Sequence, residues 1–307
     1  MGTVAIIFPG QGSQQVGMGK AAHDALPVVA ETFAEADEAL GFELSKMCFE
    51  GPEDQLRMTE NTQPAILTTS IALWRALEIP CERLAGHSLG EWTAHVAAGT
   101  LPFSAAVKLV RARGRYMQEA VPAGEGAMAA ILKAELEVVN EVCATVEGVV
   151  EAVNLNAPGQ IVIAGATAAV EAAGRALREK GARVAPLPVS APFHSSLMKP
   201  AEERLAADLR DVALNAPCCP VYVNVDAAPV TTADAARDAL LRQVSRPVRW
   251  TESIQRMIAD GTKTFIEVGH GKVLRGLVSR IDRSAQIVNV QGPDDLDAAR
   301  RVIEENA

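Results

Sequence analysis

Apolar residues along this chain fall into short continuous runs and longer stretches with helical spacing. The first run occupies residues 3–8 and ends at a Pro-Gly pair, and a second lies near 82–86. Short, β-branched runs bounded by turn residues are typical of strands buried in a parallel sheet. Apolar positions recur at helical spacing over four segments: 17–40, 61–78, 91–98 and 104–118. This alternation of strands and helices predicts an α/β layer fold with a parallel sheet.

The pattern changes between residues 124 and 189. Six segments there follow the order strand, helix, strand, strand, helix, strand: 126–132, 134–146, 149–155, 160–164, 167–179 and 183–189. This order is that of the split, ferredoxin-like unit. We therefore predict a small ferredoxin-like α+β subdomain over 124–189, inserted into an α/β body formed by 1–123 and 190–307. Three further strand-like runs belong to that body: 220–225, 264–268 and 286–290.

Composition and charge narrow the class of protein. The 307 residues are 49% hydrophobic and 22% charged, as in ordinary globular proteins, and the net charge is −9. Nucleic acid is an unfavourable general partner for so acidic a chain, because phosphate binding needs a basic field. No apolar stretch approaches the ~20 residues of a membrane helix, and no basic segment precedes the first apolar run as in a signal peptide. We expect a cytoplasmic enzyme or binding protein, monomeric by default, with no nucleic-acid or membrane partner.

The five cysteines are scattered along the chain: Cys48, Cys81, Cys143, Cys218 and Cys219. No pair has C-x-x-C spacing, and the adjacent Cys218 and Cys219 form a poor chelate. The sequence therefore predicts reduced structural thiols and no metal site.

The motif Gly86-His87-Ser88-Leu89-Gly90 is a G-x-S-x-G between a predicted strand and a predicted helix. A sharp turn in that setting exposes the serine Oγ, and small residues on either side let the turn close. The N-terminus of the following helix supplies N–H groups to an oxyanion. We interpret Ser88 as a nucleophile; the alternative is an ordinary helix-capping serine.

A serine nucleophile needs a base, and the chain has five histidines. His194 follows a predicted strand, and loops beyond the carboxyl ends of parallel strands form the crevice in such folds. His194 is therefore the best-placed base, although a loop histidine held by the backbone is an equally common arrangement. His87 precedes Ser88 directly, and adjacent side chains there tend to point apart.

The turn after the first strand, residues 9–14, resembles a dinucleotide-binding loop only superficially. Gln15 stands where the third small residue of that fingerprint belongs, and the lysine of a phosphate loop is absent. We therefore do not expect NAD or ATP binding. A Gly-flanked turn beside the serine motif can instead offer a backbone N–H to an oxyanion.

Several ordered motifs together resemble the malonyl-CoA:acyl carrier protein transacylase family, and they span nearly the whole chain. They are Phe8-Pro9-Gly10-Gln11-Gly12-Ser13-Gln14, Gly86-His87-Ser88-Leu89-Gly90-Glu91, Arg113-Gly114 with Met117-Gln118, Asn154-x-Asn156-x-Pro158-Gly159-Gln160, Pro192-Phe193-His194-Ser195, Gln243 before Pro247-Val248-x-Trp250, and Glu267-Val268-Gly269-x-Gly271-Lys272-Val273-Leu274. Trp92 and His270 depart from the usual family pattern. The resemblance implies a hydrolase-like α/β body, a ferredoxin-like insert and an active site in the cleft between them.

The resemblance also implies the catalytic roles. Ser88 would carry the acyl group as an ester, and His194 would be its general base. A backbone carbonyl near Gln243, rather than an aspartate, would orient that histidine. The backbone N–H groups of Gln11 and Leu89 would form the oxyanion hole.

By the same resemblance, Arg113 would bind the free carboxylate of a malonyl group. A planar guanidinium can hold a carboxylate through two parallel hydrogen bonds. Gln63, Met117 and Phe193 also fall on substrate-pocket positions of the family. From the residues alone, Arg113 is one more cation on a basic helix face, and Phe193 is a packing residue.

The implied reaction moves malonyl from malonyl-CoA to the phosphopantetheine thiol of acyl carrier protein, by a ping-pong mechanism through a malonyl-Ser88 ester. No metal or bound cofactor is expected, because the CoA thioester is itself a substrate. Carrier proteins are acidic, so docking would need a local basic rim; an exposed, solvated helix face is an equal alternative. The candidates are Lys199, Lys272, Arg275, Arg280 and Arg283.

Two other functions compete with this one. A hydrolase can use the same Ser-His chemistry, but it has no need of the carboxylate-binding Arg113. A non-catalytic scaffold for carrier protein need not keep Ser88, His194 and Gln243. The sequence leaves open whether such an enzyme serves fatty acid or polyketide biosynthesis, and how strictly it excludes acetyl or methylmalonyl groups.

Overall fold

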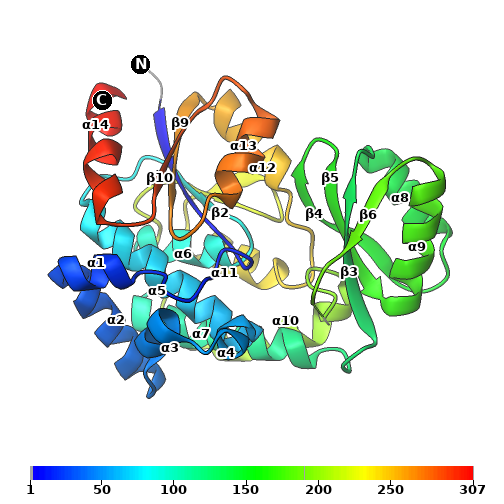
Figure 1. Cartoon of the computed structure of the whole chain (residues 1–307), viewed down its shortest axis with the longest axis horizontal. Coiled ribbons are helices and arrows are strands. Elements are labelled where there is room, and N and C mark those ends of the chain that lie inside the picture. The colour runs from blue at the N-terminus through cyan, green and yellow to red at the C-terminus, as the bar shows by residue number, and fades with distance from the viewer. Residues whose placement is uncertain (1–2, 190, 307) are drawn as a thin grey trace.

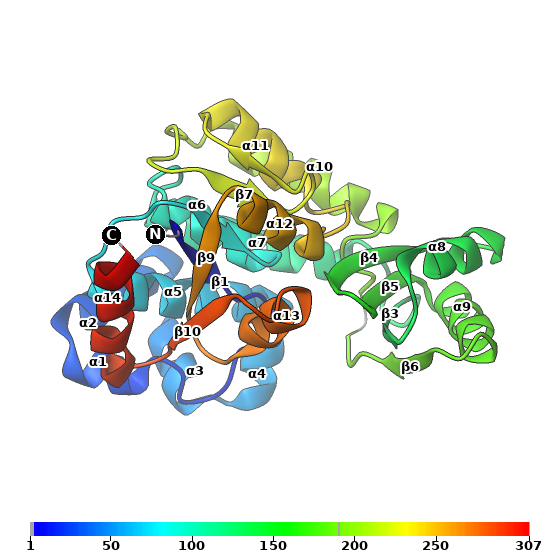
Figure 2. The ribbon, with the colours of Figure 1, turned by 90° about the horizontal axis from the view of Figure 1, so that it is seen from above.

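The computed structural model describes residues 3–189 and 191–306, and it has two unequal parts that lie side by side (Figure 1). The larger part contains a six-stranded sheet with helices on both faces. The smaller part, green in Figure 1, contains a four-stranded sheet and two helices. Seen from above, the smaller part attaches at one end of the larger one, beside α12 and α13 (Figure 2).

The large sheet is mixed rather than purely parallel. Its order is β10 (Gln286–Val290), β9 (Thr262–Val268), β1 (Thr3–Phe8), β2 (Leu84–Gly86), β7 (Val221–Val223) and β8 (Ala228–Val230). The first five strands run parallel, as predicted, whereas β8 pairs antiparallel with β7. The prediction of a parallel sheet is confirmed for these five strands, but it missed β8. The four residues between β7 and β8 are too few for a parallel crossover, so β8 pairs antiparallel.

The central strand β1 shows why its sequence has no alternation of polar and apolar residues. Val4, Ile6 and Phe8 belong to the hydrophobic core on one face of the sheet. Ala5 and Ile7 belong to a separate core on the other face. Side chains on a strand alternate between faces, so a strand covered on both sides needs apolar residues at every position.

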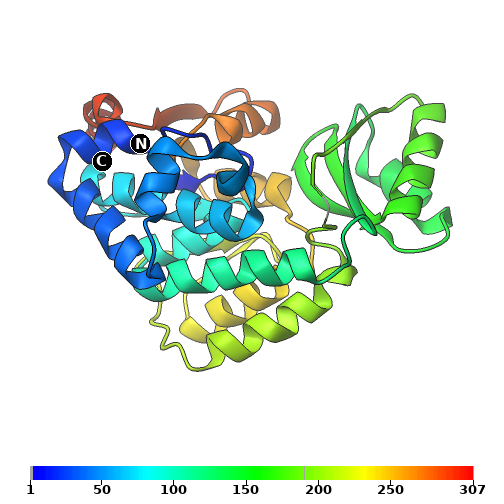
Figure 3. The same ribbon diagram turned by 60° about the horizontal axis from the view of Figure 1, so that its bottom comes forward.

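The helices of the large part pack against both faces of its sheet. They are α1 (Lys20–Ala25), α2 (Pro27–Leu40), α3 (Leu44–Glu50), α4 (Glu53–Arg57), α5 (Thr59–Leu77), α6 (Leu89–Ala97), α7 (Phe103–Glu119), α10 (Lys199–Arg210), α11 (Ala233–Arg242), α12 (Trp250–Ala259), α13 (Val273–Ile281) and α14 (Leu296–Asn306). Figure 3 shows α7 and α10, far apart in sequence, lying side by side. No helix of the described residues has the length and apolar character needed to cross a membrane.

The four predicted helical segments are confirmed, with two differences. The segment 17–40 is two helices, because Pro27 cannot continue α1 and instead begins α2. Helices α3 and α4 were not predicted, because seven and five residues are too few to show helical periodicity.

The small part follows the predicted order of elements along the chain. They are β3 (Gly126–Leu132), α8 (Leu136–Thr145), β4 (Val150–Ala157), β5 (Gln160–Ala166), α9 (Thr167–Glu179) and β6 (Arg183–Pro186). The sheet order is β4-β5-β3-β6, and each neighbouring pair is antiparallel. The part has its own apolar core, which includes Ile131, Val139 and Ile163. Residue 190, where the body was predicted to resume, lies outside the described residues.

The turn between β2 and α6 packs so closely that its two glycines admit no side chain. A Cβ on Gly86 would lie 1.9 Å from the carbonyl carbon of Gly90. A Cβ on Gly90 would lie 2.1 Å from the carbonyl oxygen of Phe8, at the end of β1. These distances are far below any van der Waals contact, so the glycines let the turn close against the sheet.

Replacing Gly90 with alanine is expected to lower the free energy of unfolding by about 3 kcal/mol or more, because the new methyl group forces the turn away from β1. Urea denaturation measures this change. The control is Gly276→Ala in α13, where an added Cβ meets nothing within 4 Å. Alanine should stabilise that helix by about 0.5–1 kcal/mol. An unchanged urea midpoint for Gly90→Ala would contradict the packing argument.

Candidate active site

Ser88 occupies the sharp turn that the sequence predicted between β2 and α6. Its backbone has φ 51° and ψ −108°, in a region that residues with a side chain rarely adopt. Asn224, just after β7, stabilises the turn from both sides. The Asn224 Oδ1 accepts a hydrogen bond from the Ser88 N–H at 2.8 Å, and its Nδ2 donates to the Gly86 carbonyl at 2.8 Å. The backbone strain at Ser88 is thus offset by the two hydrogen bonds of the Asn224 side chain.

The Ser88 hydroxyl contacts His194, the predicted base. The Ser88 Oγ lies 2.7 Å from His194 Nε2, and His194 Nδ1 lies 2.8 Å from the backbone carbonyl oxygen of Gln243. A carbonyl can only accept, so Nδ1 carries the proton and Nε2 accepts from Ser88. The orientation of His194 by a carbonyl at Gln243 agrees with the sequence analysis.

His194 is uncharged at neutral pH. Its side chain is buried, and burial together with the nearby Arg113 guanidinium lowers its pKa to about 3. A neutral imidazole has the free lone pair that a general base needs. The site therefore holds its serine and histidine in the protonation states required for proton transfer.

Arg113, on α7, reaches the same serine and is only 2% exposed. Its Nη2 donates to Ser88 Oγ at 3.2 Å and to Gln243 Oε1 at 3.0 Å, and its Nη1 donates to Gln63 Oε1 at 2.7 Å. These acceptors are all neutral, and among the described residues Nε has no partner. The guanidinium therefore retains donors and charge for an anionic ligand beside the nucleophile.

Glu91 is a buried carboxylate behind the site that the sequence analysis did not assign a role. It is 0% exposed, and burial raises its pKa to about 7, against the opposing effects of the Asn224 N–H and Arg113. Its Oε2 accepts from the Asn224 backbone N–H at 2.6 Å. Glu91 thus holds Asn224, which supports the turn, and it also interacts electrostatically with Arg113.

Glu91 and Asn224 were missed for different reasons. Glu91 is part of the quoted serine motif, and a charged residue in a largely apolar helix could have indicated a buried functional carboxyl group. Asn224 lies 136 positions from Ser88, and only a polar residue at the carboxyl end of a predicted strand marked it. Its contacts depend on β2 pairing with β7.

A cavity of about 650 Å³ opens onto these groups between the two parts of the structure. The predicted site residues that line it are Gln11, Gln63, Ser88, Arg113, Met117, Phe193 and His194. Met128 and Asn154 line it from the small part. Gln243 lies buried behind the cavity, where its Nε2 donates to the Ser88 carbonyl at 2.9 Å. The cavity lies where the family resemblance implied a cleft.

The two predicted oxyanion donors come from the turns after β2 and β1. Leu89 is the first residue of α6, so its N–H is one of those that a helix leaves without an intrahelical acceptor. Gln11 lines the cavity, and its side chain donates to Thr59 Oγ1 at 3.2 Å. Their role toward an oxyanion stays a prediction. His87 bonds to Asn156 at 2.7 Å rather than to Ser88, as expected of adjacent side chains.

Comparisons with known proteins extend over both parts of the structure. The sequence profile of the acyl transferase domain family matches residues 5–298. A malonyl CoA-acyl carrier protein transacylase of Escherichia coli strain K12 is 50% identical over 284 residues, covering 90% of this chain and 92% of that protein. The residues matched by the family profile include every candidate site residue named above.

Two solved structures are closely similar. An acyl carrier protein S-malonyltransferase from Vibrio cholerae has a TM-score of 0.94 and 48% identity, covering 96% of this chain and 99% of that one. The second is a malonyl-transacylase in complex with its type II PKS acyl-carrier protein. It has a TM-score of 0.95 and 43% identity, covering 97% of this chain and 99% of that chain. The similarity includes the α/β fold with its mixed sheet.

Proposed function

The chain belongs to the acyl transferase domain family and is an acyltransferase, and we propose that it transfers malonyl from malonyl-CoA to the phosphopantetheine thiol of acyl carrier protein. One observation carries the proposal. The Ser88 Oγ lies within hydrogen-bond distance of both His194 Nε2, at 2.7 Å, and Arg113 Nη2, at 3.2 Å. A nucleophile thus stands between a base and a cation suited to a carboxylate.

In the first half-reaction, His194 takes the proton of the Ser88 hydroxyl as the oxygen attacks the thioester carbonyl. The backbone N–H groups of Gln11 and Leu89 stabilise the resulting oxyanion, a contribution of about 3 kcal/mol per donor in comparable enzymes. The C–S bond then breaks, the protonated His194 returns its proton to the CoA sulfur, and malonyl remains as an ester on Ser88.

In the second half-reaction, the carrier thiol enters the site that CoA has left. His194 takes the thiol proton as the sulfur attacks the ester carbonyl of malonyl-Ser88. The C–O bond breaks, and the proton returns to the Ser88 oxygen. Every step uses protein groups and two thiols, so the proposal requires no metal or bound cofactor.

The charge of Arg113 couples substrate recognition to base strength. Arg113 is the second cause, after burial, of the low pKa of His194. A malonyl carboxylate bound to the guanidinium offsets that charge and raises the pKa of His194 toward its ordinary value. The substrate with the correct carboxylate therefore makes its own general base stronger.

Arg113 also separates transfer from hydrolysis. A hydrolase acting on neutral acyl groups gains nothing from a buried guanidinium whose hydrogen-bond acceptors are all neutral, and burying that charge is costly. The cation is explained if the substrate supplies the carboxylate. A transferase for a dicarboxylic half-ester accounts for both features.

The architecture around the site completes the proposal. We propose that residues 124–189 form a ferredoxin-like subdomain, which the β4-β5-β3-β6 order supports, and that residues 1–123 and 190–307 form the hydrolase-like body. A cytoplasmic, monomeric enzyme remains our prediction, and so does its part in fatty acid or polyketide biosynthesis.

Intact-protein mass measurement tests the proposal. The chain is mixed briefly with malonyl-CoA and then chased with carrier protein that bears phosphopantetheine; carrier protein without that group is the control. We expect a malonyl adduct that moves to the thiol-bearing carrier only. An adduct lost to water at the same rate without carrier would show a hydrolase. No adduct with any acyl-CoA would contradict the proposed chemistry.

The pH dependence of acylation should not follow an ordinary histidine. Because the pKa of His194 is about 3, its imidazole stays neutral as the pH falls below 6.5. The kcat/KM for malonyl-CoA reports the free enzyme, before the substrate carboxylate offsets Arg113. It should fall less than about twofold from pH 7.5 to 5.5, whereas a base with pKa 6.5 would lose about tenfold. Glu91→Gln is the control for the neighbouring carboxyl, whose pKa is about 7. If the kcat/KM values of both the unchanged enzyme and Glu91→Gln fell with a midpoint near pH 6.5, the low pKa of His194 would be contradicted.

Four of the five candidates for a basic rim lie on or beside α13, whereas Lys199 begins α10 and pairs with Glu202. Lys272, Arg275, Arg280 and Arg283 are exposed, and Arg280 also donates to Gln160 of β5 in the small part. Reversing the charge of Lys272 and Arg275 together to glutamate is expected to raise KM for carrier protein about tenfold, with KM for malonyl-CoA unchanged. Arg178→Glu, on the exposed face of α9, is the control. Equal increases in both KM values would exclude this surface as the docking site.

A further inference from the structure

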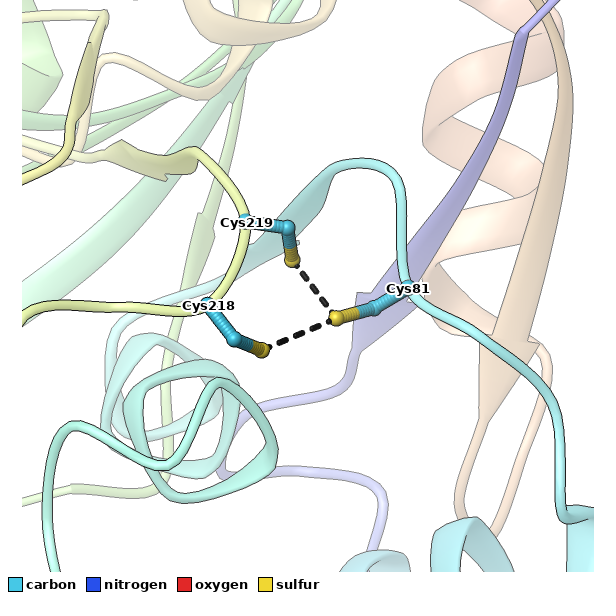
Figure 4. Close-up of side chains that lie close together, drawn as sticks. All are labelled: Cys81, Cys218 and Cys219. Carbon is cyan, nitrogen blue, oxygen red and sulfur yellow. Dashed lines mark hydrogen bonds between the residues drawn. The ribbon is translucent and has the colours of Figure 1, made fainter.

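The fold brings together three thiols that lie far apart in the sequence. Cys81 lies in the loop before β2, and Cys218 and Cys219 lie in the loop before β7. Because β2 and β7 pair in parallel, with Leu84 opposite Val221, the loops that precede the two strands meet at the amino ends of those strands. Figure 4 shows the three side chains pointing toward one another from these two loops.

The sulfur atoms form a compact cluster around Cys81. The Cys81 Sγ lies 2.8 Å from Cys219 Sγ and 3.3 Å from Cys218 Sγ, and all three sulfurs lie within 4.8 Å of one another. Among the described residues, no histidine, aspartate or glutamate joins this group. The donor set is therefore sulfur alone.

We propose that Cys81, Cys218 and Cys219 form a binding site for one thiophilic d¹⁰ cation, with Zn²⁺ as the reference ligand. Thiolate sulfur selects soft and borderline cations such as Zn²⁺ and Cu(I) over the oxygen-seeking Mg²⁺ and Ca²⁺. A disulfide would use only two of the three sulfurs that converge. A three-sulfur site leaves the fourth position of a tetrahedral ion to water.

The burial of the three residues suits such a site. Cys219 is buried, Cys81 is partly buried and Cys218 is exposed, so the cluster is anchored in the protein and open to solvent on one side. With Zn–S bonds of about 2.3 Å, tetrahedral ligands lie about 3.8 Å apart. The distances from Cys81 Sγ to Cys219 Sγ and to Cys218 Sγ must therefore increase by about 0.5–1 Å when the ion binds, a movement that two loops can make.

Metal binding displaces the thiol protons to solvent. Each sulfur coordinates as a thiolate, so forming the three Zn–S bonds releases to water every proton that the thiols still carry. No electron is transferred. The ion then joins the loop after α5 to the loop after α10.

This site lies away from the catalytic centre. Cys81 precedes the amino end of β2, whereas Ser88 follows its carboxyl end. A cation at the cysteines is therefore a structural clamp and takes no part in acyl transfer. It should raise the melting temperature of the enzyme without changing kcat by more than about twofold.

Titration of the reduced, full-length protein with Co²⁺, followed by competition with Zn²⁺, tests the proposal. Cobalt bound to thiolates gives an intense sulfur-to-metal absorption band, so sulfur ligation is read directly. We expect one Co²⁺ per chain, displaced by Zn²⁺. Loss of a group outside the ligand shell already weakens metal sites by about 10–100-fold, so Cys81→Ser should weaken binding at least about 100-fold.

Matched variants keep the test decisive. Cys143→Ser, in the small part, should leave the absorption band and affinity unchanged, and malonyl transfer reports folding in each variant. If Cys81→Ser does not fold, the exposed Cys218→Ser replaces it. The proposal is overturned if the reduced protein shows no thiolate band, if Cys81→Ser retains the affinity, or if mass measurement finds only a Cys81 disulfide, two hydrogen atoms lighter.

Discussion

Replacing Ser88 with alanine is expected to reduce malonyl transfer by at least about 10⁴-fold, because the acyl ester can no longer form. The residual rate would come from substrate binding and the oxyanion donors alone. Intact mass should show no malonyl adduct, and the turnover assay with carrier protein measures the rate. The alanine side chain fits the same turn, so the fold should be retained.

The control for this change is Ser196→Ala. Ser196 lies two residues beyond His194, but its side chain is exposed and its backbone N–H, not its hydroxyl, bonds to Glu151. Its removal should change kcat by less than about twofold. If Ser88→Ala still formed a covalent malonyl adduct, the nucleophile would be another residue.

Arg113→Ala should invert the preference of the enzyme for its acyl group. Malonyl-CoA should lose about 10²–10³-fold in kcat/KM, because its carboxylate would enter the cavity without a charged partner. Acetyl-CoA carries no such carboxylate, so its kcat/KM should stay within about threefold or rise. Parallel assays with the two thioesters measure the ratio. Arg113→Lys should restore only part of the malonyl rate, because an ammonium cannot bind a carboxylate through two parallel hydrogen bonds.

Retention of acetyl transfer distinguishes recognition from folding. Arg113 also lies near the buried Glu91, so its loss could destabilise the site as a whole. A general loss of structure would reduce both substrates alike. Arg115→Ala, an exposed cation on the same helix, should leave both rates unchanged. Equal losses for malonyl and acetyl would show that Arg113 serves the fold and not the substrate.

The elements that could be predicted are those whose burial leaves a strong local pattern. Strand β1 is apolar at every position from residue 4 because cores cover both of its faces. The order β3-α8-β4-β5-α9-β6 was readable because each element is long enough to show its period. The three-residue β8 and the short helices α3 and α4 carry no such pattern, and packing against their neighbours determines them.

The candidate site divides in the same way. The turn at Ser88 has a local cause, since only glycine fits at positions 86 and 90, and the motif could be read directly. The contact between Ser88 and His194 joins residues 106 positions apart, so the sequence alone could rank His194 only by its loop. The resemblance to a family, rather than periodicity, pointed to Gln243 and Arg113.

The cysteines show what spacing along the chain does not record. No C-x-x-C pair exists, and adjacent Cys218 and Cys219 looked like unconnected structural thiols. Cys81 lies 137 positions from Cys218, yet the parallel pairing of β2 with β7 brings their sulfurs to 3.3 Å. Spacing rules detect side chains that share one local turn, and they miss side chains that strand pairing brings together.

By itself, the sequence determined the periodic elements, the strained serine turn and the absence of a carboxylate that could be singled out to orient the base. These follow from interactions between near neighbours along the chain, which composition and spacing record. Only the tertiary structure decided that Asn224 supports the Ser88 turn, that Glu91 lies buried near Arg113, and that the thiols of Cys81, Cys218 and Cys219 lie together. Those arrangements depend on which strands pair and which helices cover them, and that choice is made by the packing of the whole chain.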